Sequence, residues 1–460
     1  MLSNDQGTEC PTSTITLDDE PTSSVVTWGN SSTGVGRAPG VVVSARGRAR
    51  YRACMPQPAR RSEWYDAWGT SRHSRLFPGP WLVHADLHNH TWLSDGVGDP
   101  ALAFACMRAA GLDVAAITDH SRWASAFLGL VSAPGWTGID GRAWRRAGSL
   151  ADEANLDGEF VAMRGFEWSD AMFGHINVWG SRRFTDPLRT FPTMGRFWRW
   201  LEAGGRDGLV GFNHPGTGRL RFAGFRYRPA MAERLVSLEI FNKTDDYLFK
   251  GTDRGESSPL SQCLDAGWQV GLLGVTDEHG ADWGCPEGKG RAGLYVRDLS
   301  RQGVLEALAA RRFFASRVKG LRVDAALTSL TSPEGGSPPP RFRMGSPVVH
   351  RPGPALVQVD LDRGEGWWGR RLNVQVLRPA PGHRLPGVDA AVEVRLPGPD
   401  EPVIAFEIDL DPADGDWVVL RVSDPSGPAD PRATGEYARL GRGIAYTSPF
   451  WLVPAQPTKA

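Results

Sequence analysis

The stretch HADLHNHTWLSDG, residues 84–96, places three histidines and two aspartates within thirteen positions, directly after the apolar pair Leu82 and Val83. A single His-x-His pair occurs by chance in many chains and usually marks a solvated turn. The cluster therefore becomes a candidate metal site only if other parts of the chain supply partners for it.

The composition is that of an ordinary globular protein. The chain has 460 residues, enough for two or three domains of about 100 to 200 residues each, and 41% of them are hydrophobic. Lys plus Arg equals Asp plus Glu, 52 against 52, so no global field favours a nucleic acid or an anionic membrane surface. We expect neither as a partner.

Cysteine spacing and the start of the chain indicate a location. The five cysteines are far apart and form no C-x-x-C pair, so neither a disulfide framework nor a thiolate zinc site is expected. No segment approaches the roughly 18 consecutive apolar residues that span a bilayer. The first thirty residues lack the basic start and apolar stretch of a secretory signal peptide. We expect a cytoplasmic protein, of an oligomeric state that the sequence does not indicate.

Three regions of the chain differ in their pattern of apolar and polar residues. Residues 1–78 are poor in long apolar runs, which predicts an irregular N-terminal leader whose aromatic end can pack on the middle region. Residues 79–320 alternate short apolar runs with helical stretches, which is typical of a βα barrel or a doubly wound sheet. Residues 321–460 alternate apolar and polar positions between turns, which predicts a C-terminal antiparallel β-sandwich-like domain.

Strands and helices of the middle region can be located from local signals. Continuous apolar runs suit strands buried on both faces, as in parallel sheets. Those runs are DVAAIT (113–118), EFVAMRGF (159–166), GLVGF (208–212), LVSLEIF (235–241) and WQVGLLGV (268–275). Asp99 is the expected N-cap of one helix, with Pro100 at its first position and Gly111 just past its end. Ser300 is the expected cap of another.

Most histidines of this region share one setting, at or within one turn of the end of an apolar run. They are His88, His90, His120, His175, His214 and His279, and two acidic residues, Glu167 and Asp277, lie likewise. The carboxyl ends of parallel strands converge on one face, so residues far apart in sequence meet there. One such histidine alone would more often be a surface or satisfied core residue. Six together favour a metal site.

The mixture of side chains indicates the metal and its chemistry. Imidazole with carboxylate suits zinc, manganese or iron, whereas an all-carboxylate site favours magnesium or calcium. Clustered cations lower the pKa of bound water to about 7, which yields hydroxide at neutral pH. The expected reaction is therefore hydrolysis, and the chain has no G-x-S-x-G motif for a serine nucleophile.

Four motifs carry a resemblance to a known family. DLHNHTWLSDG, AITDH, NHP and TDEH, in this order, resemble those of the PHP (polymerase and histidinol phosphatase) superfamily. GFEWS, GHINVWG, EIFN and ARRFFAS are more similar to its carbaryl hydrolase branch, the CehA/McbA-like proteins. The resemblance covers about residues 81–319. It implies a distorted (βα)7 PHP barrel with two or three divalent transition-metal ions, Zn, Mn or Fe.

The resemblance also implies which residues act together. The first ion would be held by His88, His90, Glu167 and Asp277, the second by Asp95, His120 and His214, and the third by Glu167, His175 and His279. Of these, Glu167, Asp277 and His214 are the expected catalytic residues. His84 and Asp86 remain outside the set, in positioning or structural roles.

Two departures from the family pattern concern the last motif and the run after it. Glu278 replaces the usual small residue and either faces solvent or crowds the third ion. GRAGLYV stands where an Arg-Thr-containing run is expected, so two ions are better supported than three.

Several residues beside the ligands have two interpretations each. Asp119 can orient a ligand or cap a helix, and Asn213 and Asn242 can contact substrate or satisfy loop backbone. Four basic residues can hold an anionic substrate, although exposed cations are more often solvated surface: Arg122, Arg219, Lys243 and Arg291.

These observations predict a metal-dependent hydrolase that uses metal-activated hydroxide on a small ester-like substrate. Five tryptophans near the ligands are expected to give two or three indole walls, which favour a neutral aryl ester or carbamate. They are Trp92, Trp123, Trp168, Trp179 and Trp283. A phosphoesterase with the same metals, and a non-catalytic module that binds metal or ligand, are the alternatives.

Overall fold

The computed structural model of this chain describes the backbone of residues 15–16 and 25–26, and residues 62, 64–121, 138–190, 194–203, 205, 207–216, 218, 220–284, 287–331 and 339–455. Two compact units are formed by residues 1–60 and 61–460. In the first, β1 (Ile15–Thr16) pairs antiparallel with β2 (Val25–Val26). All other described elements belong to the second unit.

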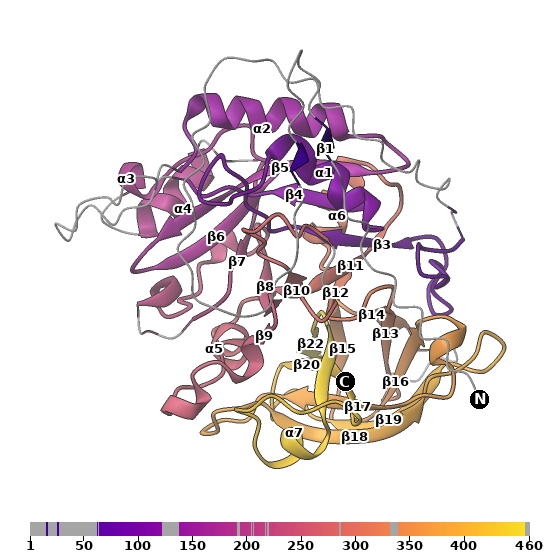
Figure 1. The fold of residues 1–460 in the computed structure, drawn as a ribbon. Helices are drawn as coiled ribbons and strands as arrows, with labels where there is room; N and C mark the ends of the chain where they lie inside the picture. The colour runs from indigo at the N-terminus through magenta and orange to yellow at the C-terminus, as the bar shows by residue number, and fades with distance from the viewer. Residues whose placement is uncertain are drawn as a thin grey trace, which may run out of the picture. The chain divides into compact units, whose positions relative to one another are not determined.

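A 16-stranded sheet dominates the second unit (Figure 1). Its main path runs through β10 (Gly271–Val275), β8 (Leu235–Asn242), β7 (Leu209–Phe212), β6 (Gly174–Trp179), β5 (Val161–Asp170), β4 (Val114–Ile117), β3 (Trp81–Asp86), β11 (Arg291–Val296), β12 (Phe313–Ser316), β21 (Arg442–Thr447), β20 (Trp417–Asp424), β17 (Arg371–Arg378) and β18 (Gly387–Arg395). Off this path lie β9 (Asp245–Asp246), β15 (Pro347–His350) and β22 (Phe450–Pro454).

The five apolar runs of the middle region are confirmed as strands β4, β5, β7, β8 and β10. Parallel pairing joins β3 to β4, β4 to β5, β7 to β8 and β8 to β10. Strand β6 is an addition that the runs did not predict, and it is antiparallel to both β5 and β7. The polar residues His175 and Asn177 interrupt its apolar pattern, so it was not recognised in the sequence.

The fold is mixed α/β, but the hydrogen bonds between the described strands do not close the first part of the sheet into a ring. Strand β10 pairs with β8 alone. Strand β10 nevertheless lies close to β11, because a Cβ at Gly274 would collide with the Arg291 carbonyl oxygen of β11. A closed (βα)7 barrel therefore stays a prediction.

Helices cover this part of the sheet, with α1, α2 and α6 packed on β4, β5 and β11 (Figure 1). The described helices are α1 (Pro100–Ala109), α2 (Gly141–Ala154), α3 (Pro187–Thr190), α4 (Met194–Ala203), α5 (Pro259–Asp265), α6 (Arg301–Ala309) and α7 (Gly435–Arg439). The predicted caps are confirmed: Asp99 accepts from Ala101 N–H and Ser300 from Gly303 N–H. Within the described part of the chain, no helix has the length and apolar character to cross a membrane.

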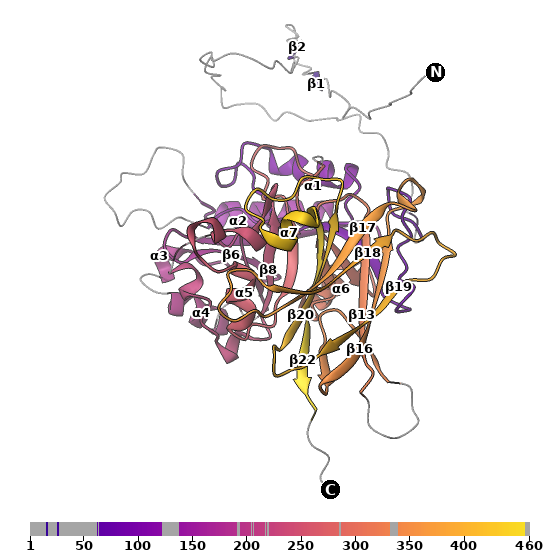
Figure 2. The same ribbon diagram turned by 90° about the horizontal axis from the view of Figure 1, so that it is seen from below.

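The C-terminal region is β-rich, as predicted, but its strands divide between two sheets. An antiparallel four-stranded sheet contains β14 (Arg341–Arg343), β13 (Arg322–Ser329), β16 (Gly353–Asp362) and β19 (Ile404–Leu410). One buried cluster joins Val323 and Val357 of this sheet to Val374 and Leu420 of β17 and β20, which gives a sandwich-like core (Figure 2). Since β21 pairs with β12, the large sheet runs unbroken from the metal-site region into this core.

The end of the predicted leader is tied into the second unit by buried ion pairs. Arg72 contacts Asp113 at 2.9 Å, and His84 Nε2 lies 2.8 Å from Asp66 Oδ2. His84 therefore has a structural role in the described unit, one of the two roles that the sequence left open.

Candidate metal centre

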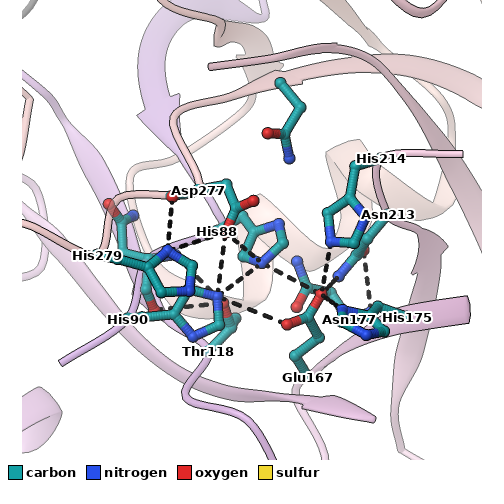
Figure 3. Close-up of polar contacts among 12 residues, drawn as sticks. His88, His90, Thr118, Glu167, His175, Asn177, Asn213, His214, Asp277 and His279 are labelled. Atoms are coloured by element: carbon teal, nitrogen blue, oxygen red, sulfur yellow. Dashed lines mark hydrogen bonds and ion pairs between the residues drawn. The ribbon is translucent and has the colours of Figure 1, made fainter. Parts of the chain in front are cut away.

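Nine side chains predicted as ligands meet in one cluster, and the sheet explains why. His88 and His90 follow β3, His120 follows β4, and His214 follows β7. Glu167 lies within β5 and His175 within β6, while Asp277 and His279 follow β10. Asp95 reaches the cluster from the loop before α1. Figure 3 shows seven of these side chains, Glu167 and Asp277 among them, pointing toward one another.

The deepest part of the cluster is formed by His88, His90, Glu167 and Asp277. The Nε2 atoms of the two histidines are 3.0 Å apart. Asp277 Oδ1 lies 3.4 Å from His88 Nε2 and 3.2 Å from His90 Nε2. Glu167 contacts the same two nitrogens, through Oε1 at 3.4 Å and Oε2 at 3.5 Å. These four residues are the set that the resemblance assigns to the first ion.

A second group lies toward solvent and contains Asp95, His120 and His279, together with His90. Asp95 Oδ2 is 3.4 Å from His120 Nε2 and 3.5 Å from His279 Nε2. The side chain of His279 is 30% exposed, whereas those of His88 and His90 are fully buried. The cluster thus has a buried floor and an open rim.

A third group surrounds the other side of Glu167. Its Oε1 is 3.2 Å from His175 Nδ1 and 3.2 Å from His214 Nε2. Its Oε2 is 2.6 Å from His120 Nδ1. Glu167 therefore faces all three groups, as a carboxylate shared between ions would.

The contacts differ from the grouping that the resemblance implied: His279 lies with Asp95 and His120, while His214 lies beside Glu167 and also groups with His88 and Asp277. The strand order β7-β6-β5 puts His214 beside His175 and Glu167. The loop after β10 instead lies over the loop after β3, where Val97 N–H donates to the His279 carbonyl oxygen. His279 consequently lies beside Asp95. Strand order cannot be read from motif order, so the motifs alone did not give this arrangement.

Opposite charges in the cluster shift most of its pKa values. Burial opposes ionisation of Glu167, but the charges of His175, His120 and His88 outweigh it and hold its pKa well below the ordinary value. Burial likewise opposes protonation of His120, yet Glu167 and Asp95 raise its pKa to about 10. His90 is different, since burial and the charge of His120 lower its pKa to about 3. Without ions, protons on histidines balance the carboxylates, and divalent cations would displace those protons.

The donor set fits divalent transition-metal ions. Two imidazole nitrogens on one ion, each at about 2.0–2.1 Å from it, are held about 3 Å apart, as the Nε2 atoms of His88 and His90 are. The buried Nδ1 of His90 has no hydrogen-bond partner in the described part of the protein. Mixed imidazole and carboxylate donors favour zinc, manganese or iron.

Glu239 of β8 is a residue of the centre that the sequence analysis missed. Its Oε1 lies 2.7 Å from His88 Nδ1, and its Oε2 accepts from the backbone N–H of His214 and from the Asn242 amide. A carboxylate on Nδ1 fixes the tautomer that leaves Nε2 free to bind an ion. The available signal was a lone ionisable residue in the apolar run 235–241.

Replacing Glu239 by Gln is expected to weaken metal binding by about 10- to 100-fold, the usual effect of losing a carboxylate that orients a ligating histidine. Competition with a chromogenic chelator measures the affinity. Glu233→Gln, at an exposed position near the start of the same strand, is the matched control. Equal affinities for Glu239→Gln and the control would show that Glu239 does not orient His88.

Asp119 and Asn213 support the ligands rather than acting as ligands themselves. Asp119 accepts from Thr91 N–H at 2.7 Å and from the Ser94 hydroxyl at 2.6 Å, which fixes the loop that carries Asp95. Asn213 donates to Glu167 Oε1 at 2.6 Å.

Asp86 and Glu278 have structural contacts near the centre. Asp86 accepts from Thr276 N–H at 3.2 Å and from the Thr276 hydroxyl, which joins the end of β3 to the end of β10. Glu278 does not face solvent, because it is buried, accepts from Gly280 N–H and pairs with Lys289 at 2.6 Å.

Three of the five tryptophans near the proposed ligands are buried, so no more than two of the five remain as candidate indole walls. Trp168, Trp179 and Trp283 are at most 2% exposed. Trp168 follows Glu167 directly and so points to the opposite face of β5, where it stacks on Phe197. Trp92 is exposed, and Trp123 lies outside the described residues.

The four histidines without a strand-end setting lie apart from the ligand groups. His84 pairs with Asp66, and His73 packs against Trp64. His350 is buried beside Ser329 in the C-terminal region, and His383 is exposed.

Comparisons with known proteins give a distant likeness to solved structures, of which two are described. No family model and no curated protein matches the chain. One structure is a two-domain protein containing a predicted PHP-like metal-dependent phosphoesterase from Bacteroides vulgatus ATCC 8482 (15% identity, 81% of this chain and 96% of that one, TM-score 0.41). The other is a proposed metal-dependent phosphoesterase from Bifidobacterium adolescentis ATCC 15703 (17% identity, 49% and 95%, TM-score 0.26). Likenesses of this size assign no function, so a functional proposal has to rest on the site itself.

Proposed function

We propose that this protein is a metal-dependent hydrolase of the PHP type that cleaves a small ester-like substrate. The observation that carries the proposal is the convergence of six histidines and two aspartates around Glu167, with a buried floor and a solvent-exposed rim. A structural metal site is normally closed by four ligands, whereas this cluster has more donors and opens to solvent.

The contacts suggest how the residues would share the ions. His88, His90, Glu167 and Asp277 would hold the first; Asp95, His120 and His279 the second; and Glu167, His175 and His214 the third. Such ions supply a Lewis acid that activates water at neutral pH and offsets charge developing on the ester oxygens. Zinc, manganese and iron are the candidates.

The chain's own groups would hold the ligands still during the reaction. Glu239 contacts His88 Nδ1, the ring nitrogen on the far side from the other ligands, and Asn213 donates to Glu167 Oε1. Asp119 accepts from the backbone of the loop that carries Asp95. Two proposed catalytic residues, His214 and Asp277, have positive φ angles of 25° and 48°. Residues with a Cβ rarely adopt this conformation, and it is concentrated at functional sites.

Two substrate classes fit this chemistry, and the charge of the site favours a phosphoester. The carbaryl hydrolase resemblance suggests a neutral aryl ester or carbamate, but the buried positions of Trp168, Trp179 and Trp283 leave no more than two of the five tryptophans for an indole wall. Two divalent ions would balance the carboxylates of Asp95, Glu167, Glu239 and Asp277, and the ammonium group of Lys243 beside Asp277 would then leave the centre positive. A positive centre attracts an anionic ester more strongly than a neutral one.

A substrate panel tests the proposal. Protein loaded with manganese or zinc is expected to hydrolyse 4-nitrophenyl phosphate with a higher kcat/KM than 4-nitrophenyl acetate or a 4-nitrophenyl carbamate. Chelation should abolish the activity, and the same metal should restore it. A clear preference for the neutral esters would favour the carbaryl hydrolase assignment. Turnover of none of these compounds by metal-replete protein would support a non-catalytic binding module instead.

A further inference from the structure

The residue that follows β8, Lys243, brings a cation to the rim of the metal centre. Its Nζ lies 3.6 Å from Asp277 Oδ2, and its side chain is 51% exposed. Asp277 uses its other oxygen, Oδ1, toward the imidazoles of His88 and His90. The ammonium group therefore lies on the solvent side of a proposed metal ligand, one side chain away from the proposed ions.

The backbone that carries Lys243 is held in one conformation. Its φ of 51° lies in the left-handed region that residues with a Cβ rarely adopt. Its N–H donates to the Val275 carbonyl oxygen at 3.2 Å, and its own carbonyl oxygen accepts from Gly290 N–H at 2.9 Å. A Cβ at Gly290 would lie 2.6 Å from the Val275 oxygen, so glycine is needed for this approach.

Arg317, just after β12, and Tyr446 of β21 hold the same turn from the other side. Arg317 donates to the Thr244 carbonyl oxygen at 2.9 Å. Two residues further on, buried Asp246 accepts from the Tyr446 hydroxyl at 3.0 Å. The turn after β8 is thus fixed by β10, by the segment before β11 and by β21. The half-exposed side chain of Lys243 extends from this fixed backbone.

An ion pair with Asp277 does not by itself account for this arrangement. A half-exposed Lys–Asp pair at this distance contributes little stability, while left-handed backbone is unfavourable for lysine. A strained backbone conformation that no stabilising contact offsets is typical of functional positions.

Of the other basic residues that the sequence singled out, Arg291 is buried in β11, and Arg122 and Arg219 lie outside the described residues. Nearby Lys289 is paired with Glu278. Among the basic residues that the structure describes, Lys243 is therefore the one that combines a half-exposed ammonium group with direct contact to a proposed ligand.

We propose that Lys243 binds the anionic group of the substrate beside the metal centre, and so selects a phosphoester over a neutral ester. The inference rests on the proposed hydrolase function and names its substrate class. A lysine donates charged hydrogen bonds to phosphate oxygens, and it offers no comparable contact to the carbonyl of a neutral ester.

The test compares Lys243→Met with Lys243→Arg, which keeps the charge, and with Lys250→Met as a matched control. Lys250 pairs with Asp245 in the same turn and does not contact the ligands. In metal-replete protein, Lys243→Met should raise the KM for 4-nitrophenyl phosphate by about 10- to 100-fold, the usual effect of losing one charged hydrogen bond. The kcat/KM for 4-nitrophenyl acetate and the metal content should stay within about twofold, and Lys243→Arg should regain most of the loss.

Calorimetric titration with inorganic phosphate separates this inference from the proposed function, because it needs no turnover. Lys243→Met should weaken phosphate binding by a similar factor. An unchanged Kd for phosphate, or equal losses on charged and neutral esters, would overturn the role of Lys243 even if the protein is a phosphoesterase. Failure of the wild-type protein to turn over any ester, with phosphate binding still dependent on Lys243, would count against the hydrolase function alone.

Discussion

Glu167→Ala is expected to lose metal from more than one position and to show no measurable hydrolysis. Its Oε1 lies within 3.4 Å of His88, His175 and His214, and its Oε2 lies 2.6 Å from His120. If this carboxylate is shared between ions, its removal takes one ligand away from each ion that it contacts. The surrounding histidines also lose a buried negative charge. Metal analysis of the purified variant gives the content directly, and the hydrolysis assay gives the activity.

His175→Ala provides the comparison, because His175 contacts Glu167 at the third group alone and is partly exposed. It should lose less metal than Glu167→Ala and keep part of the activity. His383→Ala, at an exposed position of the C-terminal region, should leave both unchanged. Full metal content in Glu167→Ala, equal to that of the wild type, would exclude a shared role for this carboxylate.

The convergence of most of the proposed ligands was predictable because they lie at or near the end of an apolar run, whereas Asp95 was assigned from the family motif alone. His120, His214 and Asp277 each follow a run that became a strand, and a parallel sheet brings such ends together. The grouping of the ligands was not predictable, since it depends on which strands are neighbours. Strand β6 has no strong apolar run, yet it determines that His214 lies beside His175.

Other features depend on which face of a strand a residue occupies. Trp168 follows Glu167 on β5, so the alternation of side chains sends it into the core. Trp179 lies deeper on β6, where its indole N–H donates to the Leu87 carbonyl oxygen. Proximity in sequence to a ligand therefore did not predict exposure at the site. Alternation along the strand would have been the better guide for Trp168.

Local sequence patterns near residue 320 do not indicate which distant strands pair. Alternating residues predicted the C-terminal strands correctly, and β16, β17, β18, β19 and β20 all formed. Pairing between β12 and β21 joins residues about 130 positions apart, with Ala315 opposite Tyr446. Edge pairing of this kind leaves no short-range signal. The large sheet continues across residue 320, and residues 61–460 form one compact unit.

Removing residues 321–460 is expected to prevent folding of the remaining chain, including the metal centre. The deletion exposes the edge of β12 and removes Trp417, a buried residue whose indole N–H donates to Asp265 in α5 at 2.8 Å. It also removes Tyr446 from Asp246, which supports the turn of Lys243. An unpaired edge beside exposed apolar surface favours aggregation. The truncated chain should appear in the insoluble fraction and bind no stoichiometric metal.

A point variant measures the same interface in the full-length chain. Trp417→Ala should lower the free energy of unfolding by about 3–5 kcal/mol, because a large buried side chain is lost and its cavity remains. Trp368→Ala, at a position that is 41% exposed, should change it by no more than about 0.5 kcal/mol. Urea denaturation followed by circular dichroism distinguishes the two. The truncation has a contrary outcome as well. A soluble 1–320 fragment that unfolds cooperatively and keeps its metal would show that the region before residue 320 folds alone. The interface through β12 and Trp417 would then be dispensable for the metal centre.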